Sequence, residues 1–240
     1  MSTLVAAGGA AAFAAVACGL AGVLVPSLIA RLPEPEPTDE PKRPYAEIAA
    51  RRGLARVTAG VAAVSGGVVG GVLGWSWPLL FWLPLVPVGV LLGYVDLRTK
   101  LLPSVVVRPA TLLVVALGGV SAALSGDGDA LVRGLVGLVV VRSVFWVLWW
   151  IRSAGMGFGD VRLSALLGFA LAYLGWAEVL LGTYASFLVF GLPGLLVALV
   201  RRDRSMMRTA YPFGPAMLAG AVIGVVLAPL LGGHLGDWGA

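Results

Sequence analysis

The sequence predicts an all-α membrane protein, folded as a bundle of about eight transmembrane helices. Hydrophobic residues make up 59% and charged residues 12% of the 240 residues, which is about half the charged share of an average soluble domain. The apolar residues fall in long runs separated by short charged clusters, and one bilayer crossing takes about 20 apolar residues. A single integral membrane domain over residues 1–240 is therefore expected.

The apolar runs give the predicted spans in chain order. No Lys or Arg precedes the first run, so the first span is expected to be an anchor and not a cleavable signal peptide. The second and sixth runs are short, which leaves seven crossings with one re-entrant segment as an alternative. The predicted spans are residues 4–28, 57–74, 78–95, 105–125, 130–151, 160–175, 177–200 and 209–232.

Basic residues in the loops predict the orientation of the bundle. They gather at one end of the predicted spans, and the positive-inside rule places that end in the cytoplasm and both termini outside. The net charge of +5 is therefore interpreted as a topology signal, and nucleic acid is not an expected partner. Arg133 and Arg142 are exceptions to this pattern, and Arg142 lies about 15 Å along a helix from the basic end. We expect it to face the bundle interior.

One long hydrophilic loop, residues 31–56, lies on the predicted cytoplasmic side. Its Pro- and acid-rich first half is expected to be extended. Its second half, K-R-P-Y-A-E-I-A-A-R-R, is expected to form either a short helix on anionic headgroups or an ordinary solvated connector. The one cysteine of the chain, Cys18, lies in the first span, so no zinc site is expected in this loop.

Two aspartates lie at the ends of predicted spans. Asp96 follows the third span in G-Y-V-D-L-R-T-K-L-L-P, and Asp160 precedes the sixth in G-M-G-F-G-D-V-R-L. An ionisable group is costly against the membrane, so both are candidate functional residues. The predicted topology puts both at the cytoplasmic boundary, where two adjacent carboxyl groups would share one proton. Such a pair can activate water and protonate a leaving amine without a metal.

The glycines before Asp160 are interpreted as a flexible entry loop. Gly155, Gly157 and Gly159 would each cost about 1 kcal/mol relative to alanine inside a helix, and glycine lets the backbone approach a bound peptide. A phosphate-binding loop is rejected, since no strand precedes these glycines. The single histidine, His234, lies in a Gly-rich tail, far from any candidate nucleophile.

Three motifs together resemble those of the prepilin peptidase family, also called type IV prepilin leader peptidases. They are D-L-R-T-K-L-L-P at 96–103, G-M-G-F-G-D-V-R-L at 155–163 and P-F-G-P at 212–215. These enzymes are intramembrane aspartic proteases of the GxGD type. The resemblance covers essentially the whole membrane region, and it implies that Asp96 and Asp160 are the catalytic pair and that Gly157 and Gly159 are the motif glycines.

Four further residues are candidates for substrate binding or for a loop at the site. Arg98 and Lys100 are interpreted first as topology determinants, and second as groups that dock an anionic substrate segment or tune the aspartates. Pro212 and Gly214 of P-F-G-P are candidates for lining the substrate cleft, although a helix start at proline also explains the motif.

The resemblance implies an endopeptidase that cuts the leader from a prepilin or pseudopilin at the cytoplasmic boundary of the cell membrane. Many bacterial members also methylate the trimmed pilin and carry paired CxxC motifs in a larger first loop. Because residues 31–56 hold no cysteine, no cofactor is expected except S-adenosylmethionine, should methylation occur. Two rival functions stay open: a proton-coupled transporter and a non-catalytic pilus or secretion assembly protein.

Overall fold

The computed structural model describes residues 2–34, 43–151, 156–201 and 212–235, and all regular structure among them is helical. Two short helices, α2 (Val25–Ile29) and α3 (Tyr45–Ala49), lie near the first loop. The eight long helices are α1 (Ser2–Val23), α4 (Leu54–Leu73), α5 (Leu79–Thr99), α6 (Ser104–Ser125), α7 (Gly128–Ile151), α8 (Phe158–Leu174), α9 (Trp176–Arg201) and α10 (Gly214–Leu235).

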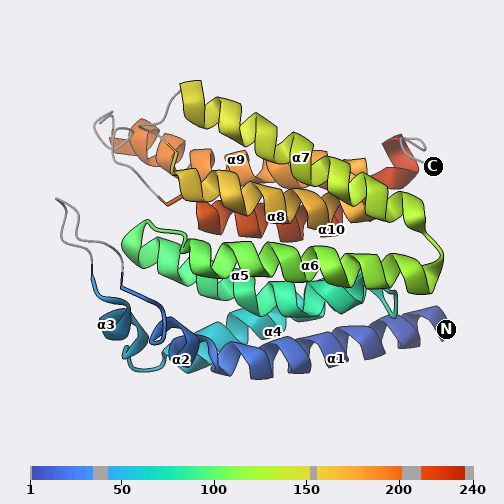
Figure 1. The fold of residues 1–240 in the computed structure, drawn as a ribbon, viewed down its shortest axis with the longest axis horizontal. Helices are drawn as coiled ribbons and strands as arrows, with labels where there is room; N and C mark the ends of the chain where they lie inside the picture. Colours follow the sequence, from blue (N-terminus) through green and yellow to red (C-terminus); the bar gives the residue numbers. More distant parts are fainter. Residues whose placement is uncertain (1, 35–42, 152–155, 202–211, 236–240) are drawn as a thin grey trace.

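The long helices lie side by side and successive ones run in opposite directions (Figure 1). The start of α1 and the end of α10 lie at the same end of the bundle. The opposite end carries α3, and it is called the α3 end below. There α5 ends and α6, α8 and α10 begin.

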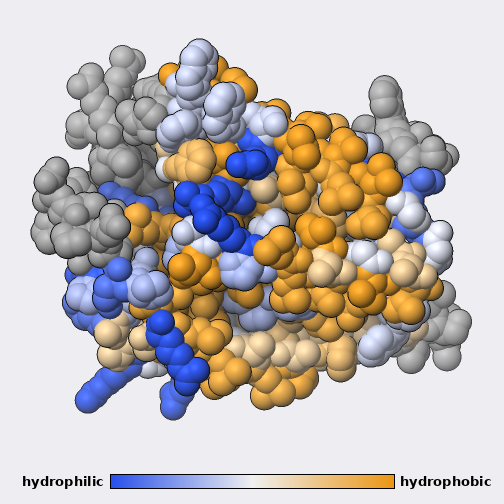
Figure 2. All heavy atoms as spheres, viewed as in Figure 1, coloured by the Kyte–Doolittle hydropathy of each residue, from blue (hydrophilic) through white to orange (hydrophobic). Residues whose placement is uncertain are grey.

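Within the described residues, six helices are long and apolar enough to cross a membrane: α1, α4, α5, α6, α7 and α10. The face in Figure 2 is hydrophobic over most of these helices, and hydrophilic residues gather toward the α3 end. The prediction of an all-α, multi-pass membrane protein is therefore confirmed. Each long helix corresponds to one predicted span, but α8 has 17 residues. The number of crossings stays a prediction.

Three predicted boundaries differ from the structure. The span expected at 4–28 breaks at Leu24 into α1 and α2, with Pro26 in the first turn of α2. The second span is not short, because α4 begins at Leu54 and has 20 residues. The last helix begins at Gly214, directly after Phe213, whereas its start was expected at 209, which lies outside the described residues.

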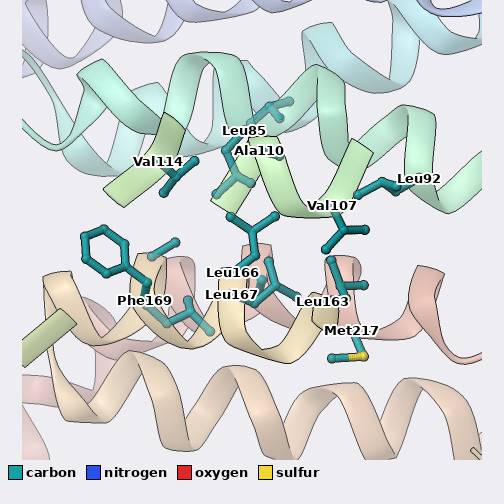
Figure 3. Packing of buried hydrophobic residues seen from close by; sticks show 14 of the residues in the cluster. Leu85, Leu92, Val107, Ala110, Val114, Leu163, Leu166, Leu167, Phe169 and Met217 are labelled. Carbon is teal, nitrogen blue, oxygen red and sulfur yellow. The ribbon is translucent and has the colours of Figure 1, made fainter. Parts of the chain in front are cut away.

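Helix α8 forms the centre of the bundle. Nearly every residue from Asp160 to Tyr173 is buried, as expected for a helix that is apolar all round. Leu166 points from α8 toward Leu85 of α5 and Ala110 of α6 (Figure 3). The other spanning helices expose large apolar side chains on one face, which suits contact with lipid.

Glycines allow three helix pairs to pack closely, as small residues do in membrane bundles. A Cβ on Gly70 of α4 would lie 2.7 Å from the carbonyl oxygen of Ala10 of α1. One on Gly168 of α8 would lie 2.7 Å from the carbonyl oxygen of Gly137 of α7. One on Gly224 of α10 would lie 2.7 Å from the carbonyl oxygen of Glu178 of α9.

The described parts of the loop at 31–56 pack on the bundle. The Glu34 carboxylate accepts the backbone N–H groups of Tyr45 and Ala46, at 2.9 and 3.3 Å, and so caps α3. The Tyr94 hydroxyl of α5 donates to the carbonyl of Ile48 at 3.2 Å. Tyr45 and Ile48 are buried. The expected short helix is therefore present, and it packs against the protein. Residues 35–42, expected to be extended, lie outside the described part.

Arg142 was expected to face the bundle interior, and this prediction is wrong. Helix α7 buries Gly137, Val141 and Phe145 against its neighbours, at a spacing of four residues that defines one helix face. Arg142 comes one residue after Val141, so it falls on the outer face and is exposed. Its long apolar stem can lie along the helix while the guanidinium extends toward the membrane surface.

Candidate active site

Two buried carboxylates stand out at the α3 end of the bundle. Asp96 is 4% exposed and Asp160 is 6% exposed, and no other charged side chain among the described residues is buried. A buried charge is costly unless it is paired, hydrogen-bonded or neutralised. The positions of these two side chains therefore call for a structural or chemical reason.

Asp96 lies in the last turn of α5 and contacts the start of α10. Its Oδ2 accepts the backbone N–H of Gly214 at 2.9 Å. Gly214 is the first residue of α10, where free N–H groups and the helix dipole favour a negative charge. A Cβ on Gly214 would lie 2.7 Å from the same Oδ2, so a side chain here would displace the carboxylate.

Asp160 lies in the first turn of α8. Its Oδ2 accepts the backbone N–H of Gly157 at 3.0 Å, and Gly157 is the N-cap of the helix. This contact is the acidic half of a capping box, in which the third helical residue bonds back to the N-cap. The side chain is thereby fixed near the end of the bundle.

Both carboxyl groups lie at the α3 end of the bundle, Asp96 in the last turn of α5 and Asp160 in the first turn of α8. Each is held through Oδ2 by one backbone N–H, and neither Oδ1 has a donor among the described residues. Two buried carboxyl groups that lie side by side cannot both ionise easily, and a pair of this kind shares one proton. Such a pair has the chemistry of one general base and one general acid, which makes Asp96 and Asp160 the candidate catalytic groups.

The glycine motif is partly helical, whereas a loop was expected throughout. Gly155 lies outside the described residues, and Gly157 is extended, with φ of −74°. Gly159 lies inside α8, and a Cβ there would be 2.8 Å from Cβ of Leu102. The prediction that Gly159 belongs to a flexible loop is therefore wrong. Glycine is needed there because the L-L-P segment packs against the helix start.

The basic residues beside the aspartates do not pair with them in the described structure. Arg98 is exposed, with its guanidinium carbon 5.4 Å from the Tyr94 ring centroid. Lys100 is exposed, adopts a left-handed conformation with φ of 53°, and ends α5. The backbone N–H of Lys100 donates to the carbonyl of Asp96 at 2.8 Å. This turn directs the chain into Leu102 and away from the carboxylate.

The P-F-G-P motif positions Gly214 through a buried phenylalanine. Pro212 is half-buried and no described contact places it at the carboxylates. Phe213 is 5% exposed and packs on the rings of Phe187 and Phe190, with centroids 5.3 and 5.0 Å away. This cluster fixes the start of α10 and thus the N–H that Asp96 accepts.

Sequence reasoning missed Leu102 and Phe213 as residues that support the site. Both lie inside quoted motifs, so their apolar character beside a glycine was the available signal. The structure describes no group of three or more His, Cys, Asp or Glu side chains that could hold a metal ion. The side chain of His234 lies outside the described part of the chain.

Comparison with known proteins finds a family match in the central part of the chain. Residues 83–199 match the model of the Type IV leader peptidase family, Peptidase_A24. The matched segment includes Asp96 and Asp160, whereas Gly214 lies beyond it. No solved structure matches the chain.

Curated relatives carry one shared name, "Prepilin leader peptidase/N-methyltransferase". The chain is 34% identical over 156 residues to the protein from Pseudomonas putida, covering 64% of this chain and 51% of that protein. It is 33% identical over 144 residues to the Aeromonas hydrophila protein, covering 58% and 47%. For Dickeya chrysanthemi the identity is 30% over 194 residues, covering 68% and 64%. The chain thus spans about half the length of the first two relatives.

Proposed function

Because residues 83–199 belong to the type IV leader peptidase family, we propose that the protein is an aspartic endopeptidase that removes leader peptides from prepilin or pseudopilin precursors. The burial of Asp96 and Asp160 at the same end of the bundle carries the proposal. Capping of α8 and α10 accounts for one hydrogen bond to each carboxylate, but not for the burial of two acidic groups at one end of the bundle.

The proposed chemistry uses the shared proton. The ionised aspartate takes a proton from a water molecule, and the water oxygen attacks the scissile carbonyl carbon. The protonated aspartate donates to the developing oxyanion. As the C–N bond breaks, a proton passes to the leaving amine, and the pair returns to its starting state. The N–H groups of Gly157 and Gly214 keep both carboxyl groups in place throughout.

The proposed site lies at the cytoplasmic membrane boundary. The α3 end carries the exposed residues Arg98 and Lys100, and positive charge in loops favours the cytoplasm. A precursor with a basic leader and an apolar helix is oriented by the same rule. Its junction would therefore lie at the depth of the two aspartates. The proposal covers the peptidase step, and S-adenosylmethionine enters only if the product proves to be methylated.

Mass spectrometry of a co-expressed prepilin tests the proposal. With the wild-type protein we expect a new N-terminus after the basic leader, and the same spectrum reports methylation. Asp96→Asn and Asp160→Asn should leave the precursor uncut at normal enzyme abundance. Asp127→Asn is the control, because Asp127 lies at the opposite end and caps Ala130, as asparagine also can.

Two outcomes would contradict the proposal. If the precursor stayed uncut although the wild-type protein was abundant, the peptidase function would be contradicted. Full cleavage by both asparagine variants would make the aspartates structural, as the assembly-protein alternative predicts. A transporter would instead show aspartate-dependent proton flux in proteoliposomes, with no change in the precursor.

A further inference from the structure

An apolar groove runs along α5 between α4 and α10. Its volume is about 510 Å³, within the range of ordinary ligand pockets. Its lining is mostly apolar and comes from α4, α5 and α10, with Leu167 of α8. The residues used below are Val57 and Val61 of α4, Gly93 and Leu97 of α5, and Pro215 and Ala219 of α10.

One end of the groove lies beside residues that adjoin Asp96. Leu97 directly follows Asp96, and Gly93 lies one turn before it. Pro215 directly follows Gly214, whose N–H bonds to Asp96. At the other end the groove reaches Trp82, so it follows α5 for about 22 Å at 1.5 Å per residue. One end of the groove therefore lies next to Asp96, and its length suits an apolar helix of about 15 residues.

The chemistry of the lining favours an apolar helix as the occupant. No lining residue carries a charge, so a basic leader gains nothing by entering. Val57, Val61 and Leu97 are 60%, 49% and 58% exposed, which leaves the groove open on its side. Gly89 and Gly93 also line the groove, where the absence of a side chain makes room for Leu218 of α10.

We propose that this groove holds the apolar helix of the precursor, with the residues just after the scissile bond beside Asp96. The inference rests on the proposed function and adds the place where the substrate binds. The helix would enter sideways from the bilayer, while its basic leader stays outside the groove at the α3 end. A lipid chain and a second copy of the protein are the other possible occupants.

Cysteine cross-linking in proteoliposomes tests the occupant. The background is Cys18→Ala with Asp160→Asn, so that the precursor stays whole, and the partner is a prepilin with one cysteine in its apolar helix. Val61→Cys lies in the groove, and Val139→Cys is the control, an equally apolar position on α7 that is 59% exposed. We expect a cross-link to the precursor at position 61 and none at 139.

The other results overturn the inference. A cross-link between two enzyme chains at position 61 would assign the groove to a second copy. If the cysteine at position 61 were reactive but never cross-linked to the precursor, lipid would be the occupant of the groove. Equal capture at 61 and 139 would show nonspecific contact. Because the enzyme is inactive in this assay, these results do not depend on whether the wild-type protein cleaves.

Steady-state kinetics give a second, independent test in the active enzyme. Val61→Trp fills the groove, so we expect KM for the precursor to rise at least about tenfold, or 1.4 kcal/mol of binding, with kcat retained. Val64→Trp is the matched control on the same helix, at a position that is 69% exposed and does not line the groove. An unchanged KM in Val61→Trp would contradict the inference.

Discussion

At the scale of single residues, the contact between Gly214 and Asp96 is the most sensitive point of the site. A Cβ on Gly214 would lie 2.7 Å from Oδ2 of Asp96, closer than two nonbonded atoms can approach. We expect Gly214→Ala to shift the carboxylate and to lower kcat at least about tenfold, the factor given by 1.36 kcal/mol of lost transition-state stabilisation. The purified enzyme should remain folded.

Gly60→Ala is the matched control for this prediction. Gly60 lies in α4, and a Cβ there would meet nothing within 4 Å. Its kcat should equal that of the wild type. If Gly214→Ala kept full activity, the N–H of Gly214 would not be holding a catalytic carboxylate.

The sequence could predict Asp96 and Asp160 as candidates because acids at span ends are costly and few. It could not predict the role of Gly159. Low helix propensity argued for a loop, but the neighbouring Leu102 decided the outcome, since its Cβ leaves no room for a side chain. The contact joins residues far apart in the chain, and tertiary packing of this kind leaves no local pattern.

At the scale of the helices, Arg133 of α7 forms hydrogen bonds to the end of α8. Its Nε donates to the carbonyl of Ala172 at 2.8 Å, and its Nη2 donates to the carbonyl of Tyr173 at 2.9 Å. Such carbonyls have no partner within their own helix. The sequence marked Arg133 only as an exception to the loop-charge pattern, because the end of α8 is brought to it by the fold.

We expect Arg133→Ala to lower the free energy of unfolding by about 1.5–3 kcal/mol, the usual worth of hydrogen bonds to a charged group. Thermal unfolding in detergent measures the change. Arg142→Ala on the same helix is the control, since Arg142 is exposed and makes no hydrogen bond within the described residues. Equal stability of the two variants would show that the bonds to α8 contribute nothing.

Most helices were predictable because a bilayer crossing requires a long apolar run, and such runs are visible in sequence. The ends of the helices were harder to predict. The break at Leu24 falls inside an unbroken apolar run, where Pro26 removes one backbone donor and starts a new helix. The outward position of Arg142 depends on which face of α7 packs on α8, and an almost uniformly apolar helix does not reveal that face.

At the scale of the whole molecule, loop charge predicts that the α3 end faces the cytoplasm. In a Cys18→Ala background, Lys100→Cys should react with a membrane-impermeant maleimide only after the membrane is opened. Ser76→Cys, between α4 and α5 at the other end, should react in intact cells. Labelling of both positions from outside would contradict the orientation and would place the aspartates on the wrong side for a basic leader.

The central claim is that Asp96 and Asp160 act as one unit, and the most direct measurement is a double-mutant cycle. We would measure kcat for cleavage of a prepilin by the wild type, Asp96→Asn, Asp160→Asn and the double variant. Each single change should lower kcat by about 10²–10⁴-fold, and the double variant should be no worse than the weaker single variant. Losses that multiply, or a single variant with near-normal kcat, would contradict a shared catalytic proton.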